Sequence, residues 1–122
     1  MRFTITVMIC ALLVGSCSSE ASCQNQLLDR SLSPDGQMVA FIFSRNCGAT
    51  VGENYQVSVV PRGELPVGKG NILVADQAPP YSDRFKPVWN GKHSVTVPIP
   101  SGARIFTKGD NANGIQVVFR QM

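Results

Sequence analysis

A stretch at residues 33–50 constrains the fold of this chain most strongly. It opens with a Ser-Pro-Asp-Gly turn at residues 33–36, in which proline fixes φ, aspartate can hydrogen-bond its own backbone and glycine accepts a positive φ. A strongly apolar segment follows at residues 38–44, and a weaker strand candidate precedes the turn at residues 27–33. The pattern therefore predicts a β-hairpin.

The strand predicted at residues 38–44 is apolar on both faces. Successive side chains of a strand point to opposite faces of its sheet. The two faces carry Val39, Phe41 and Phe43, and Met38, Ala40 and Ile42, respectively. Apolar residues on both faces are typical of a strand that is covered on both sides. We therefore expect this strand to lie centrally in the fold.

The rest of the chain alternates short strand-like segments with turns, and it contains eight prolines and eleven glycines. Further strands are expected at residues 55–60, 72–75, 84–89, 94–99, 104–108 and 115–120. The Asn90-Gly91 dipeptide indicates a hairpin between the third and fourth of these, and Pro98 indicates an edge strand or a strand end. The last two segments are expected to pair with each other. The sequence thus predicts an all-β fold, a small antiparallel sandwich or open barrel of six to seven short strands.

The N-terminal segment has the layout of a secretory signal peptide. Met1-Arg2 supplies a positive charge, twelve uncharged residues follow at 3–14, and polar residues begin at Ser18. The apolar run is too short for a transmembrane helix, which needs about 20 residues. We therefore expect an exported protein with a signal peptide at residues 1–16.

The end of this segment, Val14-Gly15-Ser16-Cys17, resembles the lipobox of bacterial lipoproteins. The resemblance implies that the Cys17 thiol carries a lipid and becomes the new N-terminus, which would hold the protein at the membrane. Ser18 after the cysteine implies sorting to the outer membrane, with the protein facing the periplasm. The alternative is ordinary cleavage nearby, which would give a soluble periplasmic or secreted protein.

Cysteine usage agrees with export. Two of the four cysteines, Cys23 and Cys47, remain after the signal segment and the lipidation site, and a disulfide is the natural pairing in an oxidising compartment. Two free thiols or half of a metal site are the other possibilities. The domain organisation predicted is a signal peptide at 1–16, a lipid-anchored tether at 17–22 and one β domain at 23–122. Fully extended, the tether would reach about 20 Å.

Charge and motif content exclude several classes of function. Eleven basic and eight acidic residues are scattered without a basic run, so nucleic acid is not an expected partner. The single histidine, His93, lacks a neighbouring carboxylate and nucleophile in the sequence, so no catalytic site is expected. Residues 110–114 resemble part of a calcium loop without its later bidentate acid and are interpreted as a hairpin loop. We expect neither a metal nor a cofactor.

A loop at residues 45–54 is the candidate binding element. Arg45 leaves the apolar strand beside Cys47, with Asn46 and Thr50 close in sequence. An arginine in a loop pinned by a disulfide is suited to recognising a carboxylate or phosphate. The alternative is a structural arginine that satisfies carbonyl groups of its own fold.

Several segments resemble a family of small, exported, uncharacterised bacterial proteins. The resemblance lies in Ser-Pro-Asp-Gly at 33–36, Arg-Asn-Cys-Gly-Ala-Thr at 45–50, Gln-Val-Ser-Val at 56–59 and the Trp89 hairpin. It implies one small β domain and transfers no activity. The predicted function is a cell-envelope lipoprotein that acts as a binding or structural module, with an envelope protein as a possible partner. The alternative is a small periplasmic enzyme or enzyme inhibitor that acts through the loop at 45–54.

Overall fold

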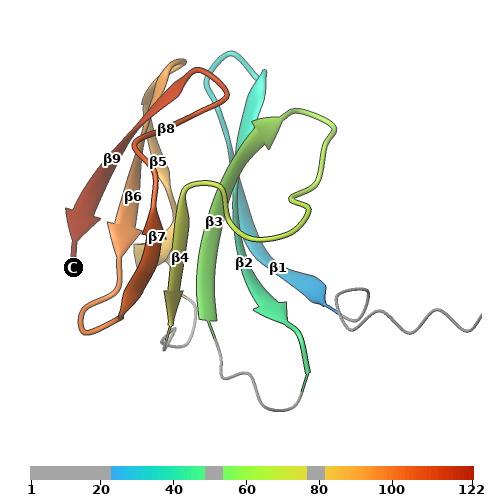
Figure 1. Ribbon diagram of the computed structural model, residues 1–122. Helices are drawn as coiled ribbons and strands as arrows, with labels where there is room; N and C mark the ends of the chain where they lie inside the picture. Colours follow the sequence, from blue (N-terminus) through green and yellow to red (C-terminus); the bar gives the residue numbers. More distant parts are fainter. Residues whose placement is uncertain (1–22, 49–53, 77–81) are drawn as a thin grey trace, which may run out of the picture.

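The computed structural model describes residues 23–48, 54–76 and 82–122, which form two packed β-sheets (Figure 1). The first sheet contains five strands in the order β1 (Gln24–Leu32), β2 (Met38–Asn46), β3 (Asn54–Pro61), β4 (Leu73–Asp76) and β7 (Ile105–Lys108). The second sheet contains four strands in the order β5 (Val88–Gly91), β6 (Ser94–Ile99), β9 (Ile115–Gln121) and β8 (Asn111–Ala112). The predicted all-β sandwich is confirmed, with nine strands in the described residues instead of six to seven. No helix in these residues is long and apolar enough to cross a bilayer.

The predicted hairpin at residues 27–44 is confirmed as the antiparallel pair β1–β2. Leu32 lies opposite Val39, and the amide of Ser33 donates to the carbonyl of Met38 at 2.9 Å. Gly36 has φ of 72°, which explains glycine at the last position of the turn. A bulge between Leu27 and Asp29 shifts the register of β1.

Strand β2 is covered on both faces, as its sequence predicts. Its inner face contributes Ala40 and Ile42 to the main core, where side chains of both sheets meet. Its outer face carries Val39, Phe41 and Phe43, which are 0–6% exposed and form a separate small cluster. The five-stranded sheet therefore buries apolar side chains on the face that points away from the second sheet.

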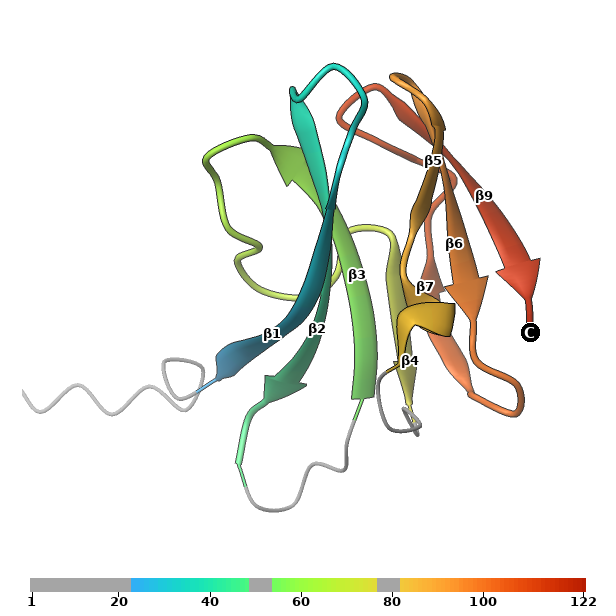
Figure 2. The ribbon, with the colours of Figure 1, turned by 180° about the vertical axis from the view of Figure 1, so that it is seen from behind.

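The predicted pairing of residues 104–108 with 115–120 is wrong. Strand β7 pairs with β4 in the first sheet, whereas β9 lies parallel to β6 in the second (Figure 2). The hairpin partner of β9 is the two-residue strand β8, joined to it by Asn113 and Gly114 at φ of 51° and 79°. Gly109 lets the chain leave the first sheet, because a Cβ there would lie 3.2 Å from the carbonyl oxygen of Asn71.

Pro98 is the second-last residue of β6, so the strand end is confirmed and the edge strand is not. Strand β6 pairs with β5 on one side and β9 on the other, but its last β5 pair is at Thr96. Pro98 therefore lies beyond the end of β5, on the part of β6 where no ladder donor is required toward that side. Beyond the end of a ladder, as at a sheet edge, the missing N–H of proline leaves no hydrogen bond of the ladder unmade.

The segment predicted as a strand at residues 84–89 begins as a short 3-10 helix, η2 (Asp83–Phe85). The strand β5 starts only at Val88. Phe85 packs edge-on against the ring of Tyr55, with ring centroids 6.1 Å apart, and the Tyr55 hydroxyl donates to the Phe85 carbonyl at 3.1 Å. The 3-10 turn therefore replaces the first part of the predicted strand, and it places the Phe85 ring against Tyr55 of the first sheet.

Candidate binding groove

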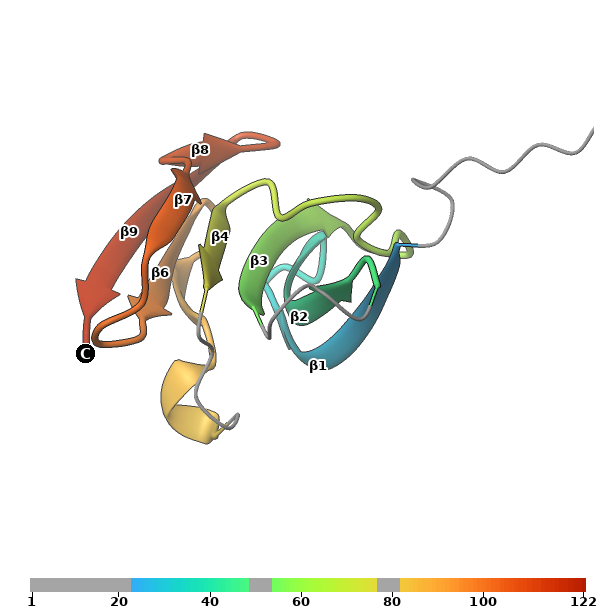
Figure 3. The same cartoon turned by 60° about the horizontal axis from the view of Figure 1, so that its bottom comes forward.

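The segment at residues 62–71, here called the covering loop, crosses the outer face of the five-stranded sheet (Figure 3). Its amides at Gly70 and Asn71 donate to the side chains of Gln56 and Ser58 on β3, at 2.8 and 3.0 Å. These two polar side chains lie under the covering loop and are only 3–4% exposed. Their hydrogen bonds to the loop compensate for this burial.

The covering loop is also attached to the start of β1. The Asn25 side-chain amide donates to the carbonyls of Pro66 and Gly68 at 3.1 and 2.9 Å. The loop therefore spans from the end of β3 to the edge strand of the sheet. It covers Phe43, which is fully buried, but leaves the other end of the outer face more open.

A groove of about 440 Å³ lies at that more open end, between β1 and the first residues of the covering loop. Its lining residues are Arg30, Leu32, Val39, Phe41, Arg62, Gly63, Glu64 and Leu65. Val39 and Phe41 are buried residues of β2, whereas Leu32 and Leu65 are 55% and 64% exposed. The groove thus combines an apolar floor with apolar side chains that face solvent, a composition typical of ligand-binding sites.

Charged residues surround this apolar groove. Arg30 comes from β1, and Arg62 and Glu64 come from the covering loop. No ion pair involves these three residues within the described parts of the chain. Arg62 lies at the β1–β2 turn. Its amide donates to the Gln37 carbonyl at 2.8 Å, and its guanidinium lies next to Gly36, with Nη1 3.8 Å from the position that a Cβ on this glycine would take. The groove therefore carries two cationic side chains and one anionic side chain.

The turn beside the groove contains an acid with a lowered pKa. The Ser33 hydroxyl donates to Oδ1 of Asp35 at 2.7 Å, and the Gln37 amide donates to the same oxygen at 3.2 Å. These hydrogen bonds to the carboxylate hold the pKa of Asp35 below its ordinary value of 3.8, and the electrostatic influence of His93 acts weakly in the same direction. Asp35 therefore acts as a turn-stabilising carboxylate.

The loop predicted for binding is placed only in part. Arg45 is half-buried, and its Nη1 donates to Oδ1 of Asn25 at 2.9 Å. Asn46 is exposed, and its Oδ1 accepts the amide of Gly48 at 2.9 Å. Thr50 lies outside the described residues. The structure therefore favours the alternative interpretation of Arg45 as a residue that stabilises its own fold.

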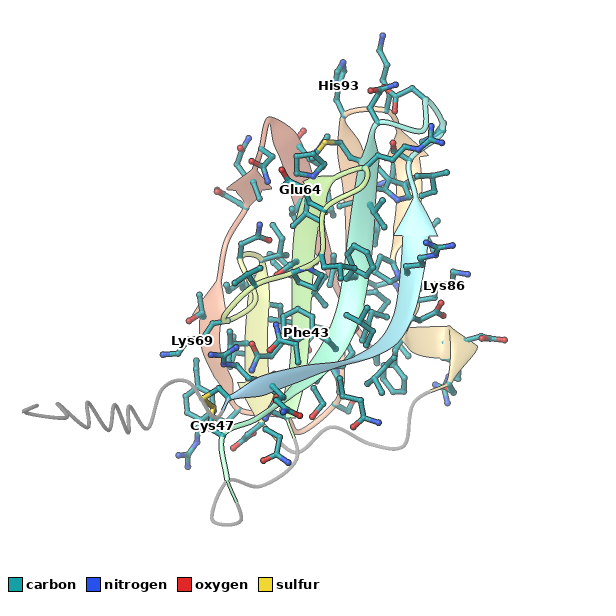
Figure 4. All side chains as sticks on the ribbon, turned by 90° about the vertical axis from the view of Figure 1, so that its right-hand side faces the viewer. Phe43, Cys47, Glu64, Lys69, Lys86 and His93 are labelled. Atoms are coloured by element: carbon teal, nitrogen blue, oxygen red, sulfur yellow. A yellow bond between two sulfur atoms is a disulfide. The ribbon has the colours of Figure 1, made fainter. Side chains whose placement is uncertain are left out.

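The predicted disulfide between Cys23 and Cys47 is present and joins the open ends of the β1–β2 hairpin. Cys17 and the remainder of residues 1–22 lie outside the described part of the chain. In Figure 4, Cys47 lies at one end of the outer face and Glu64 toward the other. The groove and the disulfide are therefore separated along the length of the sheet.

The described residues place no metal-binding cluster around the sequence candidates. His93 is exposed in the turn between β5 and β6. Within residues 23–48, 54–76 and 82–122, no group of three or more His, Cys, Asp or Glu side chains is placed to hold a metal ion. The hairpin loop predicted at residues 110–114 does not join the two expected strands; it contains the short strand β8, and only Asn113 and Gly114 form the turn to β9.

Sequence reasoning missed the groove, because its walls come from segments about thirty residues apart that meet only in the folded chain. One local signal was available. Leu65 and Val67 flank a proline within a segment otherwise rich in polar residues and glycine, and they are 64% and 92% exposed. Aliphatic residues that gather in an otherwise polar loop indicate a contact surface, whereas single scattered ones do not.

No family model matches the chain, and comparisons with curated proteins and with solved structures found no significant similarity. The resemblance to small exported bacterial proteins therefore stays a prediction.

Proposed function

We propose that this protein is a non-enzymatic binding module of the bacterial cell envelope, anchored by a lipid on Cys17, and that its binding site is the groove between β1 and the covering loop. The observation that carries the proposal is the groove itself. It has a buried apolar floor, exposed leucines on both walls and charged side chains without ion-pair partners in the described residues. Such a combination provides both apolar contact area and polar specificity.

The N-terminal sequence supports a location in the envelope. The chain has a basic start and a short apolar run, followed by a lipobox-like Val-Gly-Ser-Cys at 14–17. These features are typical of a segment that ends at a lipid-modified cysteine. The disulfide between Cys23 and Cys47 agrees with an oxidising compartment. We infer from Ser18 that the outer membrane is the destination and that the domain faces the periplasm.

The hairpin geometry supports an orientation in which the groove points away from the anchor. Five residues separate Cys17 from Cys23, so the disulfide end of β1 would lie within about 20 Å of the lipid. Arg30 lies seven residues further along β1, which corresponds to about 23 Å at the usual strand rise. A partner in the periplasm would therefore have access to the groove while the lipid remains in the bilayer.

The alternative function, a small periplasmic enzyme or inhibitor that acts through residues 45–54, has less geometric support. Nη1 of Arg45 donates a hydrogen bond to Oδ1 of Asn25. The Arg45 amide and carbonyl both pair with the Asn54 side chain, at 2.8 and 2.6 Å. These contacts tie Arg45 to β1 and β3 instead of presenting it to a ligand.

The proposal is tested by site-specific photocrosslinking in intact cells, with a benzophenone amino acid at Leu65. The matched control is the same residue at Val118, which is also exposed, at 47%, but lies on β9 in the other sheet. We expect crosslinked adducts from position 65 that are absent from position 118. Equal yields at both positions, or no adduct at position 65, would contradict a binding site in the groove.

The anchor is tested separately by detergent-phase partitioning. Wild-type protein should enter the detergent phase, and a Cys17→Ala variant should stay in the aqueous phase. Mass spectrometry of the wild-type N-terminal peptide should detect the added lipid on Cys17. Identical partitioning of the two proteins would exclude a lipid anchor at this position.

A further inference from the structure

We infer that the groove binds an amphiphilic anion, a molecule with an apolar chain and a single negatively charged head group. This inference rests on the proposed function, because it names the ligand class for the same site. It follows from three features: the chemistry of the groove floor, the balance of charge around the groove, and the joining of β1 to the covering loop beyond one of its ends.

The floor and walls are suited to an apolar chain. Phe41 and Val39 are 4% and 6% exposed and provide a preformed apolar surface. Leu32 from β1 and Leu65 from the covering loop stand on either side and are more than half exposed. Burial of these two side chains by a ligand would be favourable, because each removes apolar area from water. The volume of about 440 Å³ lies within the range of small-molecule sites.

The charge balance selects an anionic head group. Arg30 and Arg62 lie on opposite walls, and no carboxylate neutralises either of them within the described residues. Glu64 is the one acidic residue in the lining. Two guanidinium groups can donate several hydrogen bonds to a carboxylate or phosphate, whereas a cationic head group would meet two like charges.

The two ends of the groove differ, which favours one orientation of the ligand's apolar chain. Asn25 hydrogen-bonds to Pro66 and Gly68, so β1 and the covering loop are joined beyond Leu65. At the other end, Arg62 lies beside the β1–β2 turn at Gly36. On β1, Arg30 lies opposite Phe41. An apolar chain would therefore lie along Val39 and Phe41, with its head group at Arg62 near the turn and Arg30 flanking it from β1.

The test uses the full-length Cys17→Ala chain, so that no lipid on residue 17 can compete for the groove. Dodecanoate and dodecyltrimethylammonium, each below its micelle concentration, are titrated by calorimetry; they share a twelve-carbon chain and differ in the sign of the head group. We expect saturable binding of dodecanoate and at least roughly tenfold weaker binding of the cation. Absence of dodecanoate binding, or equal affinity for both probes, would overturn the inference.

Two pairs of variants locate the site. Arg62→Gln should weaken dodecanoate binding roughly three- to tenfold, whereas Arg104→Gln, an exposed arginine outside the groove, should not. Leu65→Ser should weaken binding, whereas Val67→Ser, on the same loop but outside the lining, should have no effect. All four positions are exposed, so the variants should fold. Equal effects within either pair would contradict binding in the groove.

The photocrosslinking experiment separates failure of this inference from failure of the proposed function. Specific adducts at Leu65 together with no dodecanoate binding would reject the amphiphilic anion and retain the groove as a binding site. Absence of both would reject the binding site as well. A protein adduct at Leu65 that dodecanoate does not displace would also reject the ligand class.

Discussion

Nη1 of Arg45 donates a hydrogen bond to Oδ1 of Asn25 at 2.9 Å, across the paired ends of β1 and β2. The same asparagine uses its amide group to bind the carbonyls of Pro66 and Gly68. One side chain therefore connects the hairpin with the covering loop. The arginine that the sequence offered as a ligand contact instead hydrogen-bonds to the residue that joins β1 to the covering loop.

Asn25→Ala should destabilise the domain by about 1–3 kcal/mol, because it leaves hydrogen-bonding groups of three residues, Arg45, Pro66 and Gly68, without their partner. Urea unfolding monitored by tryptophan fluorescence measures the change. Gln24→Ala, at an exposed neighbouring position, is the control and should change the free energy of unfolding by less than about 0.5 kcal/mol. If the two variants were equally stable, the connecting role of Asn25 would be excluded.

Cys47→Ser should cost roughly 3.5 kcal/mol of stability, since it removes a crosslink that closes a loop of about 25 residues in the unfolded chain. Denaturant unfolding of the oxidised protein, the reduced protein and the variant measures this cost. The reduced wild type should resemble Cys47→Ser, whereas Cys17→Ser should unfold like the oxidised wild type. A reductant that leaves the unfolding midpoint unchanged would contradict a stabilising disulfide.

Asp35 should make the domain sensitive to acid. Hydrogen bonds from Ser33 and Gln37 lower its pKa in the folded state, so its contribution is fully present above the ordinary value of 3.8. The contribution is lost as the pH falls through the lower folded-state pKa. We therefore expect Asp35→Asn to be less stable than wild type at neutral pH and to lose this difference in strong acid.

Unfolding measured across a pH series checks the Asp35 prediction. Asp110→Asn is the control, because this exposed carboxylate makes no side-chain hydrogen bond within the described residues. Its pH profile should run parallel to that of wild type between neutral and acid conditions. A constant difference between Asp35→Asn and wild type at every pH would show that the carboxylate charge is not responsible.

Trp89→Phe should loosen the attachment of β1 to the second sheet. The indole Nε1 donates to the Ser31 carbonyl at 2.9 Å, and this bond links β5 to the edge strand of the five-stranded sheet. Its loss should cost about 0.5–1.5 kcal/mol. Hydrogen exchange should accelerate at the β1 amides and remain unchanged in β9. Uniform acceleration in both strands would indicate general destabilisation instead of local release.

The local elements of the hairpin were predictable, because turn chemistry and side-chain alternation act over short distances. Strand β2 was correctly predicted to be covered on both faces, and the Cys23–Cys47 pairing followed from counting cysteines. The pairing of the last strands was not predictable. Whether β7 pairs with β4 or with β9 depends on contacts between residues far apart in the chain.

By itself, the sequence determined the β class, the hairpin, the disulfide partners and the prediction of export, since each depends on local patterns or on a small set of residues. Only the tertiary structure decided that Arg45 binds Asn25 and that the covering loop buries Gln56 and Ser58. It also decided that Arg30 and Leu65 line one groove. Loop conformations and long-range hydrogen bonds form only when the whole chain has packed, because no local preference specifies them.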